Sequence, residues 1–253
     1  MFHLQVAGGI ATIIMDRAPV NAMSEAWVAG FHTVLDGLDA RDDWSVLHLR
    51  SALKVFSAGA DLKEMRERFA APDGLERQLA TIRGYQALFA RIESLPRVTL
   101  AEISGAALGG GFEVTLACDL RIAAREVKVG LPELRLGLLP GAGGTQRMTR
   151  LAGRPAALRL ILGAEQISGE QAEQLGLVQW AVPAAELTDT ARQIAERYAA
   201  LPAHAAQAAK ACIAAAATPG MDGFTEEVAQ TSHLLQTPRT RELIGAFLAG
   251  TNR

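Results

Sequence analysis

Two glutamates beside glycine-rich or proline-containing turns are the residues best suited to chemistry. Glu113 closely follows three glycines in ALGGGFEVTLACDL, and Glu133 follows Pro132 in a second turn. Glycines at the start of a helix let the backbone approach a ligand closely, and the unpaired N–H groups there attract negative charge. A carbonyl held by such groups, with two carboxylates beside it, suits proton transfer at the neighbouring carbons.

Each of these features also has a simpler structural explanation. A run of glycines often serves a tight turn, and a lone glutamate in a first turn often stabilises the helix dipole. A second loop, FSAGAD over residues 56–61, strengthens the functional interpretation. Gly59 and its alanine neighbours allow close backbone approach, and Asp61 can cap the helix that follows.

The segments that must position these loops alternate between strands and helices. Ser24 is a good N-cap for a helix with Trp27, Phe31, Leu35 and Leu38 on one face, and a second amphipathic helix runs from Leu75 to before Pro96. This alternation predicts an α/β core with mostly parallel strands. The predicted strands are residues 10–15, 46–49, 98–103, 119–123, 127–129 and 177–182.

Helices dominate the last part of the chain. The glycine-rich run 138–145 is interpreted as a turn, and a helix is predicted from Pro155 to Leu162. Ser168 and Gln171 form the capping box of the next helix. Four helices are then predicted, over residues 186–200, 202–217, 221–235 and 238–248.

Composition excludes several function classes. The net charge of −2 over 253 residues gives no reason to expect a nucleic-acid partner. The two cysteines fit no zinc or disulfide spacing, and the five histidines show no metal-ligand spacing, so we expect no metal site. No apolar run is long enough to cross a membrane and no signal peptide is apparent, so we expect a cytoplasmic location.

Three ordered blocks give a specific resemblance. They are FSAGADLKEM at 56–65, ALGGGFE at 107–113 and GLPELRLGLLPGAGGTQRMTRLAG at 130–153, with VNAMS before them and ISGEQAEQLGLVQWAVP after them. In this combination the chain resembles the enoyl-CoA hydratase/isomerase (crotonase) family along essentially its whole length.

The resemblance implies a fold, an assembly and a ligand. Residues 1–185 would form a crotonase-like α/β spiral of ββα turns, and residues 186–253 would form a helical oligomerisation region that builds homotrimers, often paired into hexamers. The ligand would be an acyl-CoA thioester, with no separate cofactor because coenzyme A is part of the substrate. The backbone N–H groups of Ala60 and Gly110 would form the oxyanion hole.

The resemblance also implies substrate contacts and a reaction. Coenzyme A contacts map to Ala22, Ala58, Asp61 and Leu62. Hydratases of the family use glutamates at the positions of Glu113 and Glu133, so we expect a lyase of fatty acid metabolism that adds water to a 2-enoyl-CoA and gives a 3-hydroxyacyl-CoA.

Several alternatives stay open. They are an enoyl-CoA delta isomerase, a methylglutaconyl-CoA hydratase and, more distantly, a non-catalytic acyl-CoA or RNA binder, although four lysines offer little to RNA. Phe112 and Leu131 depart from the pattern of short-chain hydratases, which leaves acyl chain length, branching and pathway open.

Overall fold

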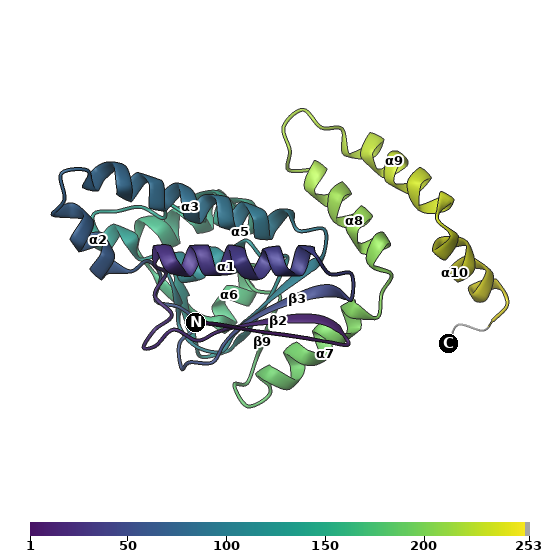
Figure 1. Ribbon diagram of the computed structural model, residues 1–253, viewed down its shortest axis with the longest axis horizontal. Coiled ribbons are helices and arrows are strands. Elements are labelled where there is room, and N and C mark those ends of the chain that lie inside the picture. The colour runs from purple at the N-terminus through teal and green to yellow at the C-terminus, as the bar shows by residue number, and fades with distance from the viewer. Residues whose placement is uncertain (251–253) are drawn as a thin grey trace. The chain divides into compact units, whose positions relative to one another are not determined.

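A six-stranded sheet lies at the centre of the first part of the chain in the computed structural model, which describes residues 1–250 (Figure 1). Its order is β1-β2-β3-β4-β6-β9; β1 pairs antiparallel with β2, and the other pairings are parallel. Its strands are β1 (Phe2–Ala7), β2 (Gly9–Met15), β3 (Trp44–Ser51), β4 (Val98–Ile103), β6 (Leu120–Ala124) and β9 (Trp180–Val182). The predicted α/β core with mostly parallel pairing is therefore confirmed.

The strand β1 was not predicted from the sequence. It lies at the edge of the sheet, and its side chains are exposed or half-buried. The signal was present but overlooked, because Phe2, Leu4 and Val6 alternate with the polar residues His3 and Gln5. The turn at Gly8 brings β1 back along β2, and the two strands pair in antiparallel orientation. The expected strand at 10–15 extends by one residue to Gly9.

Helices cover the sheet, and local caps fix where the first of them begin. The side chain of Ser24 accepts from the Trp27 N–H at the start of α1 (Glu25–Asp39), and all four apolar residues predicted for its inner face are buried. Asp61 caps α2 (Leu62–Phe69) in the same way. The long helix α3 (Gly74–Ser94) lies beside α1 (Figure 1).

A strand, strand, helix unit recurs around the glycine-rich loops. Strand β4 is followed by β5 (Ala107–Leu108) and α4 (Gly110–Leu116), and β6 is followed by β7 (Lys128–Gly130) and the 3₁₀ helix η1 (Glu133–Leu136). Strands β5, β7 and β8 (Gln166–Ser168) form a second sheet of three strands. The predicted ββα organisation is observed here.

The glycine-rich run after η1 does more than turn. Helix α5 spans Gly144–Leu162 and consists of two helical parts separated at Gly153, whose backbone is not helical (φ +77°). The predicted helix from Pro155 to Leu162 is confirmed as the part of α5 after this break, and the helical part before it, from Gly144, was not predicted. The first turns of α5 were not recognised because Gly141, Gly143 and Gly144 lie at its start, and glycine is a weak helix former. The capping box of Ser168 and Gln171 at α6 (Gly169–Gln174) is confirmed.

The chain divides into two compact units, Met1–Ala199 and the remainder from Ala200. Helix α7 (Leu187–Ala199) packs against β2, β3, β4 and β6 of the sheet. The boundary expected at residue 185 lies before this helix, and the first unit extends through it. The second unit holds α8 (Ala203–Ala215), α9 (Gly223–Gln236) and α10 (Pro238–Leu248), and α9 contacts both of the others.

Candidate active site

The short helix α4 carries Glu113 and is buried over its whole length. Its start depends on glycines that no other residue could replace without movement. Gly109 has φ +56°, and a Cβ at Gly111 would lie 2.4 Å from the carbonyl oxygen of Ser57. The tight fit seats the first turn of α4 against the 56–61 loop, so that Glu113 lies in the first helical turn.

Two backbone N–H groups meet where these loops touch. Gly59 has φ +89°, and a Cβ there would lie 3.1 Å from the Gly110 nitrogen, so the loop passes directly over the start of α4. Within residues 1–250, neither the Ala60 N–H nor the Gly110 N–H donates to a protein acceptor. Two adjacent free donors can bind an oxygen atom that carries developing negative charge.

The carboxylate of Glu113 is held by the start of α5. Its Oε1 accepts from the backbone N–H of Ala142 at 2.9 Å and of Gly144 at 2.7 Å. Burial of the side chain, which is 3% exposed, and the nearby charge of Glu133 raise the pKa of Glu113 to about 7 in spite of these bonds. Glu113 can therefore hold or release a proton near neutral pH.

Glu133 is the first residue of η1 and reaches toward the glycine turn. Its Oε1 would lie 3.0 Å from a Cβ placed on Gly109, so its carboxylate lies against the start of α4. Its Oε2 is buried and accepts no hydrogen bond within the described part of the chain. Burial raises the pKa of Glu133 above its usual value. An unpartnered buried oxygen of this kind is free to bind a ligand or water.

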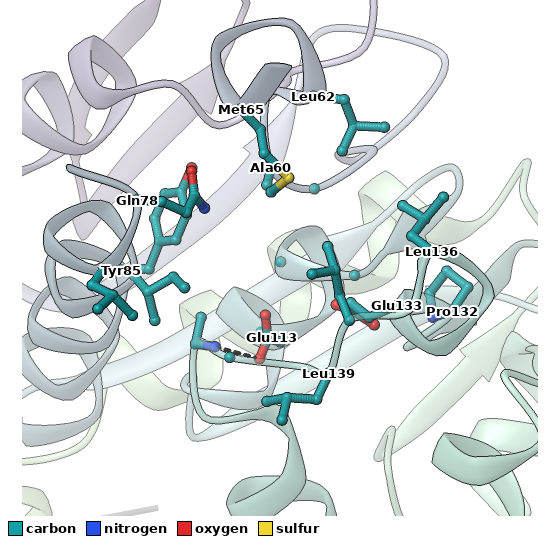
Figure 2. A pocket seen from close by; sticks show the side chains of 18 of the residues that line it. Ala60, Leu62, Met65, Gln78, Tyr85, Glu113, Pro132, Glu133, Leu136 and Leu139 are labelled. Carbon is teal, nitrogen blue, oxygen red and sulfur yellow. Dashed lines mark hydrogen bonds between the residues drawn. The ribbon is translucent and has the colours of Figure 1, made fainter. Parts of the chain in front are cut away.

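Both glutamates and both N–H donors face one cavity of about 360 Å³ (Figure 2). Its other walls are largely apolar side chains from α2, α3 and the segment after η1. The lining comprises Ala58, Gly59, Ala60, Leu62, Met65, Phe69, Leu75, Gln78, Leu79, Ile82, Tyr85, Gly109, Gly110, Glu113, Pro132, Glu133, Leu136, Leu138, Leu139, Gly141 and Ala142. A mostly apolar cavity with a few convergent polar groups is typical of a small-molecule site.

Six of the eight residues singled out from the sequence lie in this lining: Ala58, Ala60, Leu62, Gly110, Glu113 and Glu133. The other two, Ala22 and Asp61, are not part of the lining, and Arg17 forms hydrogen bonds to both. Its guanidinium donates to the Ala22 carbonyl at 2.7 Å and to Oδ2 of Asp61 at 2.9 Å. Burial alone would raise the pKa of Asp61, but the bond from Arg17 holds it below the usual range.

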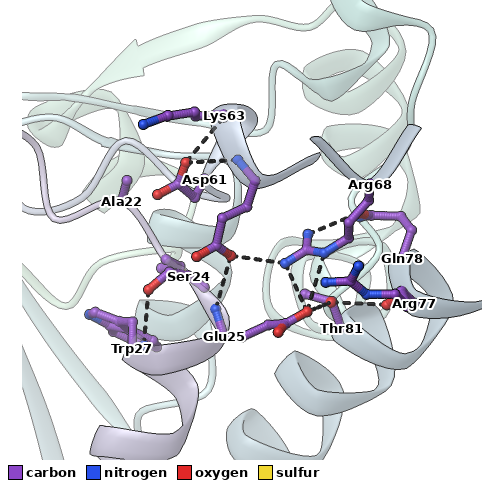
Figure 3. A network of polar contacts seen from close by, with 12 residues as sticks. Ala22, Ser24, Glu25, Trp27, Asp61, Lys63, Arg68, Arg77, Gln78 and Thr81 are labelled. Atoms are coloured by element: carbon purple, nitrogen blue, oxygen red, sulfur yellow. Dashed lines mark hydrogen bonds and ion pairs between the residues drawn. The ribbon is translucent and has the colours of Figure 1, made fainter. Parts of the chain in front are cut away.

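Sequence reasoning missed the residues behind the cavity wall. Arg68 of α2 is only 4% exposed and forms ion pairs with Glu25 of α1 at 3.0 Å and with Glu64 at 2.8 Å (Figure 3). It also donates to Gln78 of α3 at 3.0 Å. One weak signal was available, because Glu64 and Arg68 have the spacing of an i, i+4 pair.

Neither a metal cluster nor a membrane span is found in the described residues. Across residues 1–250 no group of three or more His, Cys, Asp or Glu side chains could hold a metal ion. In the same range no helix has the length and apolar character needed to cross a bilayer.

Two comparisons with known protein sequences point to the same family. The family model for enoyl-CoA hydratase/isomerase matches residues 5–250. A Bacillus subtilis (strain 168) protein described as a probable enoyl-CoA hydratase is 40% identical over 191 residues, which is 75% of this chain and 72% of that protein.

Solved structures give the same result for the fold. An enoyl-CoA hydratase from Bacillus anthracis superposes with a TM-score of 0.91 at 32% identity, covering 98% of this chain and 96% of that one. Pseudomonas aeruginosa DspI superposes with a TM-score of 0.91 at 33% identity, covering 98% and 94%. The predicted crotonase fold is confirmed.

Proposed function

Because this chain belongs to the enoyl-CoA hydratase/isomerase family, we propose that it is an enoyl-CoA hydratase, adding water reversibly to a 2-enoyl-CoA to give a 3-hydroxyacyl-CoA. The observation that carries this proposal is the pair of carboxylates, Glu113 and Glu133, on one cavity with two free N–H donors. A chain that only moved a double bond would need one carboxylate; a second on the same cavity supplies what addition of water requires.

The oxyanion hole would act on the thioester carbonyl. The oxygen accepts from the N–H groups of Ala60 and Gly110, which draws electrons away from the conjugated double bond and makes C3 electrophilic. The same bonds stabilise the enolate that forms when water attacks. Each such donor contributes about 3–4 kcal/mol to lowering a barrier of this type.

The glutamates would supply the proton transfers. A water molecule held between them adds through its oxygen to C3 and gives its proton to one carboxylate. The other glutamate, protonated beforehand, delivers its proton to C2, and the two steps restore one shared proton to the pair. The raised pKa values of Glu113 and Glu133 suit this sharing, because the pair then holds a proton near neutral pH.

The remaining parts of the proposal concern substrate binding, assembly and location. Coenzyme A would lie along Ala22, Ala58, Asp61 and Leu62, and no cofactor beyond it is required. The C-terminal unit would build a trimer or hexamer, which is supported by exposed apolar side chains on α9 and α10, among them Phe224, 82% exposed, and Phe247, 73% exposed. The enzyme would act in the cytoplasm.

Product analysis with two substrates tests the reaction. Purified protein is incubated separately with crotonyl-CoA and with 3-hexenoyl-CoA, and the products are separated by chromatography. The proposal expects 3-hydroxybutyryl-CoA from the first and little turnover of the second. Conversion of 3-hexenoyl-CoA to its 2-enoyl isomer, with crotonyl-CoA left unchanged, would replace the hydratase by an isomerase.

A further inference from the structure

One polar side chain in the apolar part of the cavity wall has an unused donor. Gln78 of α3 is 9% exposed and lines the cavity together with Tyr85 (Figure 2). Ile82, which also lines the cavity, lies on the same face of the helix. Within residues 1–250, Nε2 of Gln78 donates to no protein acceptor. The Nε2 atom is not buried, and Gln78 lines the cavity, so this donor is available to a ligand there.

The orientation of the Gln78 amide is fixed from behind. Its Oε1 accepts from Nη1 of Arg68 at 3.0 Å. A guanidinium has donors only, so the amide oxygen must face Arg68, and the NH₂ group takes the other side. Arg68 is in turn held by Glu25 and Glu64, and Thr81 donates to Glu25 in the same network (Figure 3).

The NH₂ group of Gln78 is the polar group that is free to donate in this part of the cavity, because its neighbours are apolar or already hydrogen-bonded. Met65, Leu79 and Ile82 are apolar, and the Tyr85 hydroxyl already donates to the Met23 carbonyl. Leu62 and Ala58, the residues assigned to coenzyme A, belong to the α2 end of the lining. An acyl chain extending from the oxyanion hole toward α3 would therefore meet an apolar wall with a single free donor.

Charge decides which acceptor fits. None of the residues lining the cavity, within the described part of the chain, is Lys, Arg or His. The charge of Arg68 is already matched by Glu25 and Glu64, while Glu113 and Glu133 add negative charge to the same cavity. A carboxylate at the far end of the acyl chain would lack a cation, so a neutral oxygen is the better partner.

We propose that Gln78 is a specificity-determining residue that selects acyl-CoA thioesters whose chain carries a neutral oxygen, such as a hydroxyl, ether or keto group, where the chain passes α3. This rests on the assignment of the cavity to an acyl-CoA under the proposed function. The Gln78 NH₂ group donates one hydrogen bond to that oxygen, and the apolar neighbours bind the carbons on either side of it.

Binding of unreactive thioesters tests this without turnover. Octanoyl-CoA is compared with a series in which successive chain methylenes are replaced by an ether oxygen of similar size, and dissociation constants are measured by isothermal titration calorimetry. At one chain position the ratio of ether to carbon affinity should be about tenfold higher in the native protein than in Gln78→Leu, the effect of one hydrogen bond. At the other positions the ratios should agree.

Two further variants separate the donor from the network behind it. Gln78→Glu keeps an oxygen toward Arg68 but replaces the donor with an acceptor, so it should lose the preference as Gln78→Leu does. Thr81→Val removes another member of the network without touching the cavity and should keep it.

Two results would overturn the proposal in different ways. Equal ratios of ether to carbon affinity in the native protein and both Gln78 variants, at every chain position, would show that Gln78 forms no selective hydrogen bond to a chain oxygen. Failure of the native protein to bind octanoyl-CoA at all would remove the acyl-CoA site and the proposed function with it. Tight binding without hydration of crotonyl-CoA would leave the Gln78 proposal standing and reject only the reaction.

Discussion

At the scale of a single residue, the pKa of Glu113 is set by two opposing influences. Two backbone N–H groups stabilise its charged form, while burial and the charge of Glu133 oppose that form more strongly. The result is a carboxyl group that is protonated through much of the acidic range in the folded protein. In the unfolded chain the same group would ionise near its ordinary pKa of 4.5.

This difference predicts a pH-dependent cost to stability. Because the folded-state pKa of about 7 lies above the unfolded value of 4.5, stability from Glu113 is present below about pH 4.5 and is lost as the pH rises through about 7. The loss is on the order of 3 kcal/mol. Gln mimics the protonated form, so Glu113→Gln should unfold at higher denaturant than the native protein near pH 8 and at similar denaturant near pH 5. A variant less stable than the native protein near pH 8 would contradict this.

Gly144 gives a second prediction at this scale. A Cβ at Gly144 would lie 2.8 Å from Oε1 of Glu113 and 2.9 Å from Cδ1 of Leu131. Gly144→Ala should therefore displace the Glu113 carboxylate and lower kcat on crotonyl-CoA by about 10²-fold, the usual cost of misplacing a reacting group.

A matched control for Gly144→Ala is Gly37→Ala, at a helical position where a Cβ meets nothing within 4 Å. It should keep full activity and stabilise the fold by about 1 kcal/mol, because alanine is the better helix former. Full activity in Gly144→Ala would show that the Glu113 position is less constrained than its contacts indicate.

At the scale of elements, Arg68 joins three helices that surround the cavity. Its partners lie on α1, α2 and α3, so it fixes the position of the α2 wall relative to α3 (Figure 3). Removing it leaves the Gln78 oxygen without its donor and leaves the carboxylates of Glu25 and Glu64 without their cation. Arg68→Leu should lower the free energy of unfolding by about 2–3 kcal/mol, as measured by urea denaturation.

Arg192 on α7 serves as the comparison for Arg68. It is exposed and pairs with Glu196 and Asp189 of its own helix. Arg192→Leu should leave the urea midpoint unchanged, since exposed ion pairs contribute little. Equal effects of the two substitutions would show that the Arg68 network is no more than a surface ion pair.

The elements that the sequence predicted well are those fixed by local signals. Ser24, Asp61 and Ser168 cap their helices in the expected way, because a cap depends on a few adjacent residues. The start of α5 could not be predicted, since the N–H groups of Ala142 and Gly144 are stabilised by Glu113 from a different helix. The edge strand β1, in contrast, could have been predicted, because apolar and polar residues alternate in FHLQVA.

The candidate site residues also divide into those with a local sequence signal and those without one. Glu113 and Glu133 stood out because each lies beside a glycine-rich or proline-containing turn and also matches a family pattern, and both line one cavity. Arg17, Arg68 and Gln78 belong to no such pattern. Their roles come from contacts between segments far apart in the chain, which spacing alone does not reveal.

At the scale of the whole molecule, the second unit presents apolar side chains that its own helices do not cover. Phe224 is 82% exposed and Val228 is 71% exposed, and they lie one turn apart on α9. Each would contribute about 1.5–3 kcal/mol if buried against another subunit.

Charging this surface should therefore break the assembly. The double variant Phe224→Asp and Val228→Asp should shift the molar mass measured by light scattering after size exclusion from a trimer or hexamer toward the monomer. An unchanged mass, or a native protein that is already monomeric, would contradict the proposed role of the C-terminal unit.

The central claim is that two glutamates act together on a water molecule, and hydration of crotonyl-CoA tests it most directly. Loss of the conjugated thioester absorbance is followed for the native protein, Glu113→Gln and Glu133→Gln, each of which keeps the size of the side chain. We predict rapid hydration by the native protein and a fall of about 10²–10⁴-fold in either variant. A native protein inert on crotonyl-CoA, or a Glu113→Gln variant as active as the native protein, would contradict the two-glutamate mechanism.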